Sequence, residues 1–450
     1  MHIGSLRKSF EQKWGTVQVS ALAPMLSDED ILRACEQLGH RWRTSPFQPA
    51  AVVRSMVYRG LHPDKSIRNV IEDLGADEVF GEGKSITESA WCQARSRLPE
   101  GLYRKMVKRK AADAKERFAT GWHLFGRNVS IFDGTTVSMP DTPDLVEAFG
   151  YANSKHGHSR FPVGRVGAFM NGAIPVITDY QIESYQTSEI QIFREMLPFL
   201  EEESIWIADR HHSNYVNFVL SKDYGLDWVT RLHSRRDGRK LAKEGEPIGE
   251  NQWLVTLHLS KETRRQYPNM DLPETITVRL IRHDYNDNGT DKTIWILTSL
   301  LDPQRYPKEE IVEAYRSRWG IETHYNHLKT TLDMAVLRSK TSKNVRSEIG
   351  ATMLAHNLVW MLIYEAAEYT GESPERISFA AAVKIVLKYS PRICAASSAK
   401  RIQLYKSMLK RIIENKNPHR PGRKQPRMVK REKKRYPALK TSREEARRAA

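Results

Sequence analysis

The sequence predicts an α/β protein with helical regions at both ends, and three observations support this fold class. Residues 1–120 are expected to form helices, because capping residues and acidic first turns mark their starts. Residues 121–225 alternate short apolar strands with helices, and two of these strands end in an aspartate. Residues 226–300 alternate apolar and polar side chains, which is typical of strands with one exposed face.

Four helices are expected in the N-terminal region, and the last of them has a basic side. It begins at Ser85, because Ser85 and Glu88 have the spacing of a capping box. Arg95 and Arg97 follow on the same helix, and we expect both side chains to be exposed. Such a basic surface is either an ordinary solvated face or a contact for nucleic acid, and the residues alone favour neither. The other three helices are expected at residues 27–38, 49–59 and 66–74.

Two aspartates mark the ends of apolar strands in the central region. Asp133 ends the strand of residues 128–133, and Asp209 follows the strand of residues 204–208. Gly134 and the apolar run after it predict a hairpin directly beyond Asp133. Both acids lie at the carboxyl ends of strands, where sheets expose functional residues. Either acid alone is more often a turn or capping residue.

A polar arc lies on the helix expected at residues 307–334. At about 100° per residue, Tyr315, Arg318, Glu322 and Lys329 fall within an arc of roughly 60°. A surface ion pair is the ordinary explanation for any two of these residues. Two cations grouped with a carboxylate and a phenol on one narrow arc favour a site that handles phosphate groups.

The spacing Tyr-x2-Arg-x3-Glu-x6-Lys resembles the signature of the DDE transposases of bacterial insertion sequences, in the insertion-sequence-4 family. Tyr315, Arg318, Glu322 and Lys329 match this signature position for position, and Trp319 falls where many members have tryptophan. The motif is long and spaced, so it is far more specific than a short glycine motif. The resemblance implies that Glu322 is the third acid of a triad whose other two members lie upstream.

The resemblance covers about residues 30–370 and implies an RNase H-like catalytic core that is interrupted by a β-rich insertion. Asp133, Asp209 and Glu322 match the family's catalytic triad in order and in element type, which is strand, strand, helix. It further implies that these acids bind two Mg²⁺ ions, for which Mn²⁺ is expected to substitute. Hard divalent ions prefer carboxylate oxygens, so His211 and His212 are expected to be supporting residues or DNA contacts.

Roles in DNA binding are also implied by the resemblance. Arg318, Lys329 and Tyr315 are expected to position the DNA backbone near the cut, since cations neutralise phosphates. Trp295 lies on the strand from which family members hold a flipped base with tryptophan, although its register is one residue off and a buried strand tryptophan is the more ordinary reading. The expected DNA contacts are Tyr315, Arg318, Lys329, Trp319, Arg210, Trp295, Arg95 and Arg97.

Composition agrees with a partner that is a polyanion. The net charge is +17, and residues 400–450 hold 19 Lys and Arg against 4 Asp and Glu. This basic tail is expected to lack structure when free, and it either attracts DNA without specificity or merely keeps the chain soluble. The three cysteines form no metal-ligand spacing, and the sequence has neither a signal-peptide core nor a run of 18 apolar residues, so a cytoplasmic location is expected.

The function expected from these observations is that of a DNA transposase. It binds the inverted repeats at the ends of an element in double-stranded DNA, cleaves these ends and joins the 3′-hydroxyl to target DNA, acting as a homodimer in the active complex. The alternatives are a metal-dependent nuclease of the same fold that cuts without joining, and a DNA-binding protein that no longer cuts. The expected domains are residues 1–120 (helical, DNA-binding), 121–225 and 301–370 (the two parts of the core), 226–300 (the β-rich insertion), 371–415 (helical) and 416–450 (the basic tail).

Overall fold

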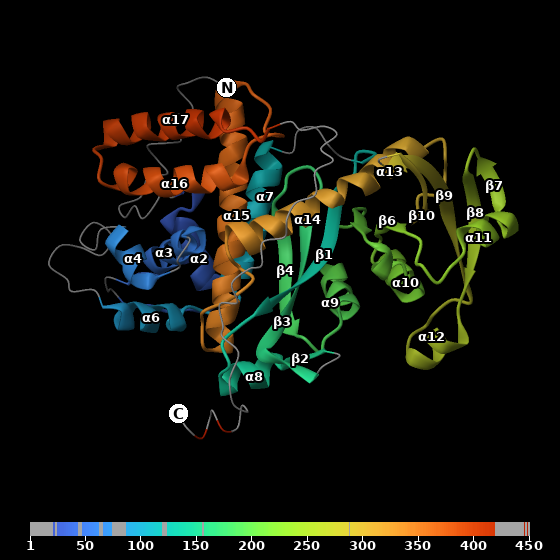
Figure 1. The fold of residues 1–450 in the computed structure, drawn as a ribbon, viewed down its shortest axis with the longest axis horizontal. Helices are drawn as coiled ribbons and strands as arrows, with labels where there is room; N and C mark the ends of the chain where they lie inside the picture. The colour runs from blue at the N-terminus through green and yellow to red at the C-terminus, as the bar shows by residue number, and fades with distance from the viewer. Residues whose placement is uncertain are drawn as a thin grey trace.

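The computed structural model has a mixed α/β architecture, as the sequence predicts. A large mixed sheet occupies one half of the molecule, and a bundle of helices occupies the other half (Figure 1). Among the described residues, no helix combines the length and the apolar character that a membrane crossing requires. The structure describes residues 21–22, 25–43, 47–62, 66–73, 87–118, 124–154, 157–287, 289–418, 445 and 448.

The central strands of the sheet surround β1 (Val129–Ser138). On one side β1 pairs antiparallel with β3 (Gly157–Asn171), which in turn pairs antiparallel with β4 (Ile177–Ser184). On the other side β1 runs parallel to β5 (Ile205–Ala208), and β5 runs parallel to β6 (Asp227–Arg231). The carboxyl ends of β1, β5 and β6 therefore lie at the same edge of the sheet.

The hairpin predicted directly after Asp133 is wrong, because β1 continues without a turn through Gly134. The register with β3 is unbroken there, with Asp133 opposite Ala168 and Thr135 opposite Val166. The reason for a glycine is space: a Cβ on Gly134 would lie 2.4 Å from Oε2 of Glu189. Gly134 thus marks a close approach of another side chain to the strand and not a chain reversal.

The β-rich region extends the same sheet. β6 pairs antiparallel with β10 (Thr290–Thr298), and the sheet continues through β9 (Thr275–Asp287) and β8 (Gln252–His258) to β7 (Glu246–Gly249). These strands form the end of the molecule that lies farthest from the helical half (Figure 1). The alternating pattern therefore predicted strands correctly, and the pairing of β6 with β10 makes them continuous with the core.

One long helix, α15 (Ser342–Thr370), forms the centre of the helical half. Most of its residues are buried, and it packs against α3 (Pro49–Leu61), α7 (Leu102–Phe118) and α17 (Ser398–Glu414). In Figure 1, α3, α16 (Phe379–Cys394) and α17 lie on the side of α15 away from the sheet, whereas α7 lies between α15 and the sheet and packs against β4. Helices from both ends of the chain therefore share one apolar core with α15.

The expectation that Arg95 is exposed is wrong. Arg95 lies on α6 (Glu88–Arg97) with only 7% of its surface exposed, and its guanidinium lies 5.5 Å from the ring of Trp91. Arg97, two residues further along, is exposed as expected. Thr87 caps this helix, and the expected cap Ser85 lies outside the described residues.

The helix expected at residues 307–334 has three parts. α13 (Lys308–Ser317) is followed by α14 (Trp319–Asn326), with an interruption of one residue at Arg318, and η4 (His327–Thr331) is a π-helical turn. Ile321, Leu328 and Leu332 are buried, as the apolar side of the expected helix requires. The prediction of one continuous helix was therefore only approximate, because the winding changes at Arg318 and again in η4, which contains Lys329.

Buried Arg279 of β9 fixes the loop that leads into α13. Its Nη1 donates hydrogen bonds to the carbonyl oxygens of Leu300 and Tyr306 over 3.1 and 2.7 Å. A charged group without any exposed surface is stable only when such partners satisfy it. Strand β9 thus holds the start of α13 in place through Arg279.

The remaining elements connect and cover these layers. The basic tail beyond residue 418 lies outside the described residues, apart from two single positions. The remaining elements are α2 (Asp28–Gln37), α4 (Ile67–Asp73), α8 (Pro143–Phe149), β2 (Tyr151–Ser154), α9 (Glu189–Met196), η2 (Leu197–Phe199), η3 (Arg210–His212), α10 (Tyr215–Asp223), α11 (Gly238–Glu244) and α12 (Lys261–Gln266).

Candidate active site

Asp133 and Asp209 lie side by side where the parallel pairing of β1 with β5 ends. The prediction that Asp133 ends its strand is wrong, because β1 continues to Ser138, whereas Asp209 directly follows β5. The parallel register pairs Ile131 of β1 with Ile207 of β5, so the residue two positions further on each strand is an aspartate. Neighbouring strands are about 4.8 Å apart, which brings both acids to one site. The arrangement follows from topology, because only a parallel pair aligns two carboxyl ends.

Asp209 is held by two groups that follow it in the chain. Its side chain caps η3, where Oδ1 accepts the amide of His211 over 2.9 Å, and Nδ1 of His212 lies 3.1 Å from the same oxygen. Burial by itself would raise the pKa of Asp209. The hydrogen bond and charge of His212, together with the His211 amide and the positive charge of Arg318, outweigh burial and lower this pKa to about 2.

His212 connects Asp209 to a further acid, Glu189. The ring is 1% exposed, and its Nε2 lies 3.7 Å from Oε1 of Glu189. The rings of Phe132 and Phe193 pack against it with centroids 5.0 and 4.9 Å away. Packing and two acidic neighbours therefore fix the position of this imidazole.

Glu189 is the first residue of α9, and its carboxylate packs against Gly134 within electrostatic reach of Asp133. The close approach to Gly134 places it next to the strand residue that follows Asp133. Burial raises the pKa of Asp133 to about 6, and the negative charges of Glu189 and Asp209 add to this effect. The Gly134 amide and the charge of Arg318 act in the opposite direction. Three carboxylates thus share one partly buried site.

The interrupted helix brings the polar arc to these acids. Arg318 is 9% exposed, and its Nη2 donates to Oε1 of Glu322 over 3.3 Å. Its guanidinium also lies 5.8 Å from the ring of Tyr315. The charge of Arg318 lowers the pKa of Asp133 and that of Asp209, so it lies within electrostatic reach of both. The carboxylate of Glu322 itself is 57% exposed.

A buried tyrosine fixes the position of α14 relative to β1. The hydroxyl of Tyr325 donates to the carbonyl oxygen of Asp133 over 2.6 Å, three residues after Glu322. Burial raises the pKa of Tyr325 well above its ordinary value, so the phenol stays protonated as a donor. Tyr325 therefore ties the helix that carries Glu322 to the strand that carries Asp133.

The other residues predicted near the acids differ in how far they are exposed to solvent. Lys329 is half-buried, and burial lowers its pKa while the charge of Asp133 opposes that change. Arg210 is exposed directly after Asp209. Trp319 begins α14, and its side chain lies outside the described part of the structure. Arg318 thus contacts both Tyr315 and Glu322 despite the interruption, and Lys329 lies within electrostatic reach of Asp133.

Trp295 and Arg97 were also predicted to contact DNA. The ring of Trp295 packs against Trp253 with centroids 5.9 Å apart and covers Gly238, where a Cβ would lie 2.3 Å from it. This packing favours a structural role for Trp295. Arg97 lies on α6 in the helical half (Figure 1), where Arg95 is buried.

Sequence reasoning missed Glu189 and Tyr325, and it undervalued His212. Glu189 follows the helix cap Ser188, where an acid has an ordinary explanation in the helix dipole. Tyr325 resembles any apolar residue of a helix. His212 was visible beside Asp209, yet its contact with a distant glutamate depends on the fold.

The donor set suits a hard divalent cation. The acids offer several carboxylate oxygens, and the pKa of Asp133 is raised first by burial and then by the negative charges of Glu189 and Asp209. A Mg²⁺ ion prefers such oxygens and would relieve this repulsion. The residues present therefore fit a divalent metal site.

Comparisons with known proteins agree with this geometry. The transposase DDE domain family matches residues 124–358, which is more than half of the chain. The transposase InsG for insertion sequence element IS4, from Escherichia coli (strain K12), is 25% identical over 430 residues, covering 93% of each chain. InsZ, which also carries a transposase name and comes from the same strain, is 29% identical over 141 residues, or 31% of this chain and 46% of InsZ.

Among solved structures, the chain is similar to a cryo-EM structure of the piggyBac transposase synaptic complex with hairpin DNA. The matched region includes 92% of this chain and 88% of the piggyBac chain. The TM-score is 0.42 at 9% identity, which is too low to add an argument. The family match spans both strands that carry the paired aspartates and the whole polar helix. The chain therefore belongs to the DDE transposases, and it is of the insertion-sequence-4 type.

Proposed function

We propose that this DNA transposase binds the terminal inverted repeats of its element, cleaves their ends and joins the freed 3′-hydroxyl to target DNA. Asp133, Asp209 and Glu322 are the proposed catalytic residues and metal ligands. The observation that carries the proposal is the alignment of Asp133 with Asp209 on parallel strands, beside an arginine that pairs with Glu322.

We assign the central strands to an RNase H-like core. Support comes from the strand order β4-β3-β1-β5-β6, in which the first three strands are antiparallel and the last three are parallel. The strands β7 to β10 lie between β6 and α13 in the chain, in the position of an insertion. On this assignment Asp133 lies within β1, Asp209 directly follows β5, and Glu322 lies on the helix that packs against β1.

The proposed cofactor is Mg²⁺, as two ions, with Mn²⁺ as a substitute. When bound, such ions favour formation of the attacking oxygen nucleophile and stabilise charge on the leaving oxygen of a phosphodiester. Asp133 and Asp209 supply oxygens from the sheet, and Glu322 supplies them from the helix. His212 keeps Asp209 ionised and oriented.

The cations of the arc are proposed to hold the DNA backbone at the cut. Arg318 is 9% exposed, and its charge lies within electrostatic reach of Asp133 and Asp209, so a phosphate oxygen bound at these acids would meet a positive group. Lys329 lies near Asp133, as its pKa indicates. Tyr315, half-buried against Arg318, completes the group. These side chains position the substrate without transferring protons themselves.

A basic group beside Asp209 extends this surface. Burial lowers the pKa of His233, and the charges of Arg235, Arg236 and Arg210 lower it further, so these three arginines lie within electrostatic reach of His233. The charge of Arg231 reaches Tyr315 in the same way. We propose that these arginines contact phosphates of the DNA that leads to the cut, and that Arg97 and the N-terminal helices contribute a separate contact. Two paired ends imply a homodimer in the active complex.

The decisive experiment uses DNA that carries the element's flanking inverted repeats together with Mg²⁺. Wild-type protein should cut at the ends and yield joined products with target DNA. Asp133→Asn, Asp209→Asn and Glu322→Gln should each lose cleavage while retaining end binding. A nuclease that cuts without joining would give cleaved ends and no joined products, and near-normal cutting by any variant would remove that acid from the triad.

A further inference from the structure

Three histidines form a second cluster behind the helix that carries Glu322. His324 lies on α14, His327 begins η4, and His356 lies in the middle of α15. Each offers a ring nitrogen, and these three atoms lie within 4.8 Å of one another. The proposed catalytic chemistry uses none of these residues.

The ring nitrogens of this cluster lack the partners that buried polar atoms ordinarily have. Nδ1 of His324, Nδ1 of His327 and Nε2 of His356 are buried without a hydrogen-bond partner among the described residues. His356 is 0% exposed, and its other nitrogen has only a long contact of 3.5 Å to Asn357. Buried polar atoms without partners are uncommon, and three in one place require an explanation.

The surroundings favour neutral rings whose lone pairs are free. His327 stacks on Phe379 with centroids 4.5 Å apart, and Trp360 lies 5.2 Å from His324. Burial lowers the pKa of His327 to about 4 and that of His356 well below its ordinary value. A neutral imidazole is the form that binds a metal.

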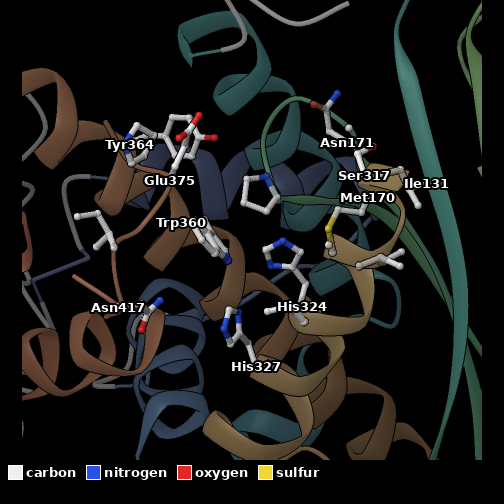
Figure 2. A pocket seen from close by; sticks show the side chains of 17 residues that line it. Ile131, Met170, Asn171, Ser317, His324, His327, Trp360, Tyr364, Glu375 and Asn417 are labelled. Carbon is white, nitrogen blue, oxygen red and sulfur yellow. The ribbon is translucent and has the colours of Figure 1, made fainter. Parts of the chain in front are cut away.

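A pocket of about 350 Å³ opens onto two of the three rings. Figure 2 shows His324 and His327 projecting into it beside Trp360, with Glu375 and Asn417 also on its wall. The pocket gives an ion a route to the cluster, and it leaves room for water as a further ligand. Three protein ligands and one open position are a common arrangement for zinc.

We propose that His324, His327 and His356 form a binding site for a divalent transition-metal ion of the Zn²⁺ class. Nitrogen ligands select such ions over Mg²⁺, which prefers oxygen. Zn–N bonds of about 2.0–2.1 Å place tetrahedral nitrogen ligands roughly 3.4 Å apart, so the rings need to close by about 1 Å on binding. That movement is within the reach of side-chain rotation.

The site is distinct from the acidic site. At about 100° per residue, His324 and His327 lie roughly 200° and 140° around the helix from Glu322, on the opposite side. The ion joins α14 and η4 to α15. It therefore clamps the segment that carries Glu322 and Lys329 onto the helical half, and its role is to stiffen this segment.

Co²⁺ absorbance is the direct test, made on full-length protein freed of metal and kept in excess Mg²⁺. One equivalent of Co²⁺ should give visible bands of a nitrogen-rich site, and Zn²⁺ should remove them. The bands should persist in Asp133→Asn/Glu322→Gln, which disables the acidic site. His327→Gln should weaken binding by at least about 100-fold, whereas exposed His258→Gln should not change it.

The melting temperature gives a second test that does not depend on the absorbance of Co²⁺. Zn²⁺ should raise the melting temperature of wild type, because a ligand that binds only the folded state stabilises it. The increase should be absent in His327→Gln and retained in His258→Gln. If His327→Gln fails to fold, X-ray absorption of the wild-type Zn²⁺ complex decides by counting imidazole ligands. Fewer than three imidazoles, no Co²⁺ bands in wild type, or loss of the bands in the acid variant would overturn the proposal.

Discussion

The ring of His212 lies against Asp209, with Nδ1 3.1 Å from Oδ1 of the carboxylate. The same ring faces Glu189 with its other nitrogen, 3.7 Å away. A single buried imidazole thus sets the orientation of two acids at the edge of the sheet. This makes His212 a positioning residue, because it acts on the proposed ligands and does not touch the substrate.

Replacing His212 should weaken metal binding more than it disturbs the fold. In His212→Gln the pKa of Asp209 should rise from about 2 toward its ordinary value, and its carboxylate should lose a fixed orientation. Loss of such an outer partner ordinarily costs about 10- to 100-fold in metal affinity or activity. The Mg²⁺ dependence of single-turnover cleavage should therefore shift to higher concentration.

His211→Gln is the matched control for this variant. The His211 side chain is exposed, and it serves Asp209 only through its backbone amide, which the substitution leaves in place. We expect its Mg²⁺ dependence to equal that of wild type. Equal behaviour of the two variants would show that the His212 ring does not support Asp209.

Glu189 should matter for cleavage although it stands outside the triad. Its carboxylate lies within electrostatic reach of Asp133, so Glu189→Gln should reduce Mg²⁺ affinity and move the pH midpoint of cleavage downward, because one of the charges that raise the pKa of Asp133 is gone. Glu195→Gln, on the exposed side of the same helix, is the control. An unchanged Mg²⁺ dependence and pH profile in Glu189→Gln would contradict this role.

Gly134 offers an independent test of the same contact. A Cβ in Gly134→Ala would lie 2.4 Å from the Glu189 carboxylate and should push it away, so cleavage should fall as it does in Glu189→Ala. The two changes should not add when combined, because both remove one interaction. Additive losses in the double variant would mean that Gly134→Ala acts through the strand itself.

The sequence predicted the part of the site that lies on regular elements. Asp133 and Asp209 could be found because an apolar run in the sequence ends at each of them, and the parallel register of β1 and β5 then aligns them, although β1 itself continues to Ser138. The spacing of Tyr315, Arg318, Glu322 and Lys329 survives a one-residue interruption, since α14 continues in nearly the same direction as α13 (Figure 1). Local periodicity was sufficient for these features.

What the sequence could not predict depends on contacts between distant segments. Gly134 has the appearance of a turn residue until Glu189 is seen above it. Arg95 has the appearance of a surface cation, but the helices around α15 enclose it beside Trp91. The pairing of β6 with β10, which makes the β-rich region part of the sheet, has no local signal either. Each of these features requires the tertiary packing to be known.

Asp133 should weaken the metal-free fold at neutral pH. The pKa of Asp133 is about 6 in the folded protein, and we take the ordinary value of 3.8 for the unfolded chain. The folded form therefore binds the proton more tightly. The free energy of unfolding should therefore fall as the pH rises from about 4 to about 6, and change little through this group above that range. Asp133→Asn removes the charge and should stabilise the metal-free protein by up to about 3 kcal/mol at pH 8.

Melting temperatures in a metal chelator can check this effect. The advantage of Asp133→Asn should be largest at pH 8 and should vanish below about pH 3, where the wild-type carboxyl is mostly protonated in both states. Added Mg²⁺ should raise the melting temperature of wild type more than that of the variant, because the variant lacks a charged ligand. A variant less stable than wild type at pH 8 without metal would refute the assigned crowding of charge.

Lys329 should act on the rate of cleavage more than on DNA affinity. It is half-buried and within electrostatic reach of Asp133, whereas most affinity for DNA comes from many cations spread over the surface. A group that positions the scissile phosphate is different, since a small misplacement there can cost about 100-fold in rate. Lys329→Ala should therefore slow single-turnover cleavage at saturating protein by about that factor, with little change in end binding.

Arg316→Ala provides the control because it removes the same charge from the exposed side of α13. Arg316 is held only by a contact of 3.5 Å to Glu313 on the surface, and such pairs contribute under about 1 kcal/mol. Its cleavage rate should stay near that of wild type, so net charge alone does not explain a loss in Lys329→Ala. If Lys329→Ala cuts at the rate of Arg316→Ala, or if weaker binding accounts for its whole defect, then Lys329 is a surface cation and does not position the phosphate.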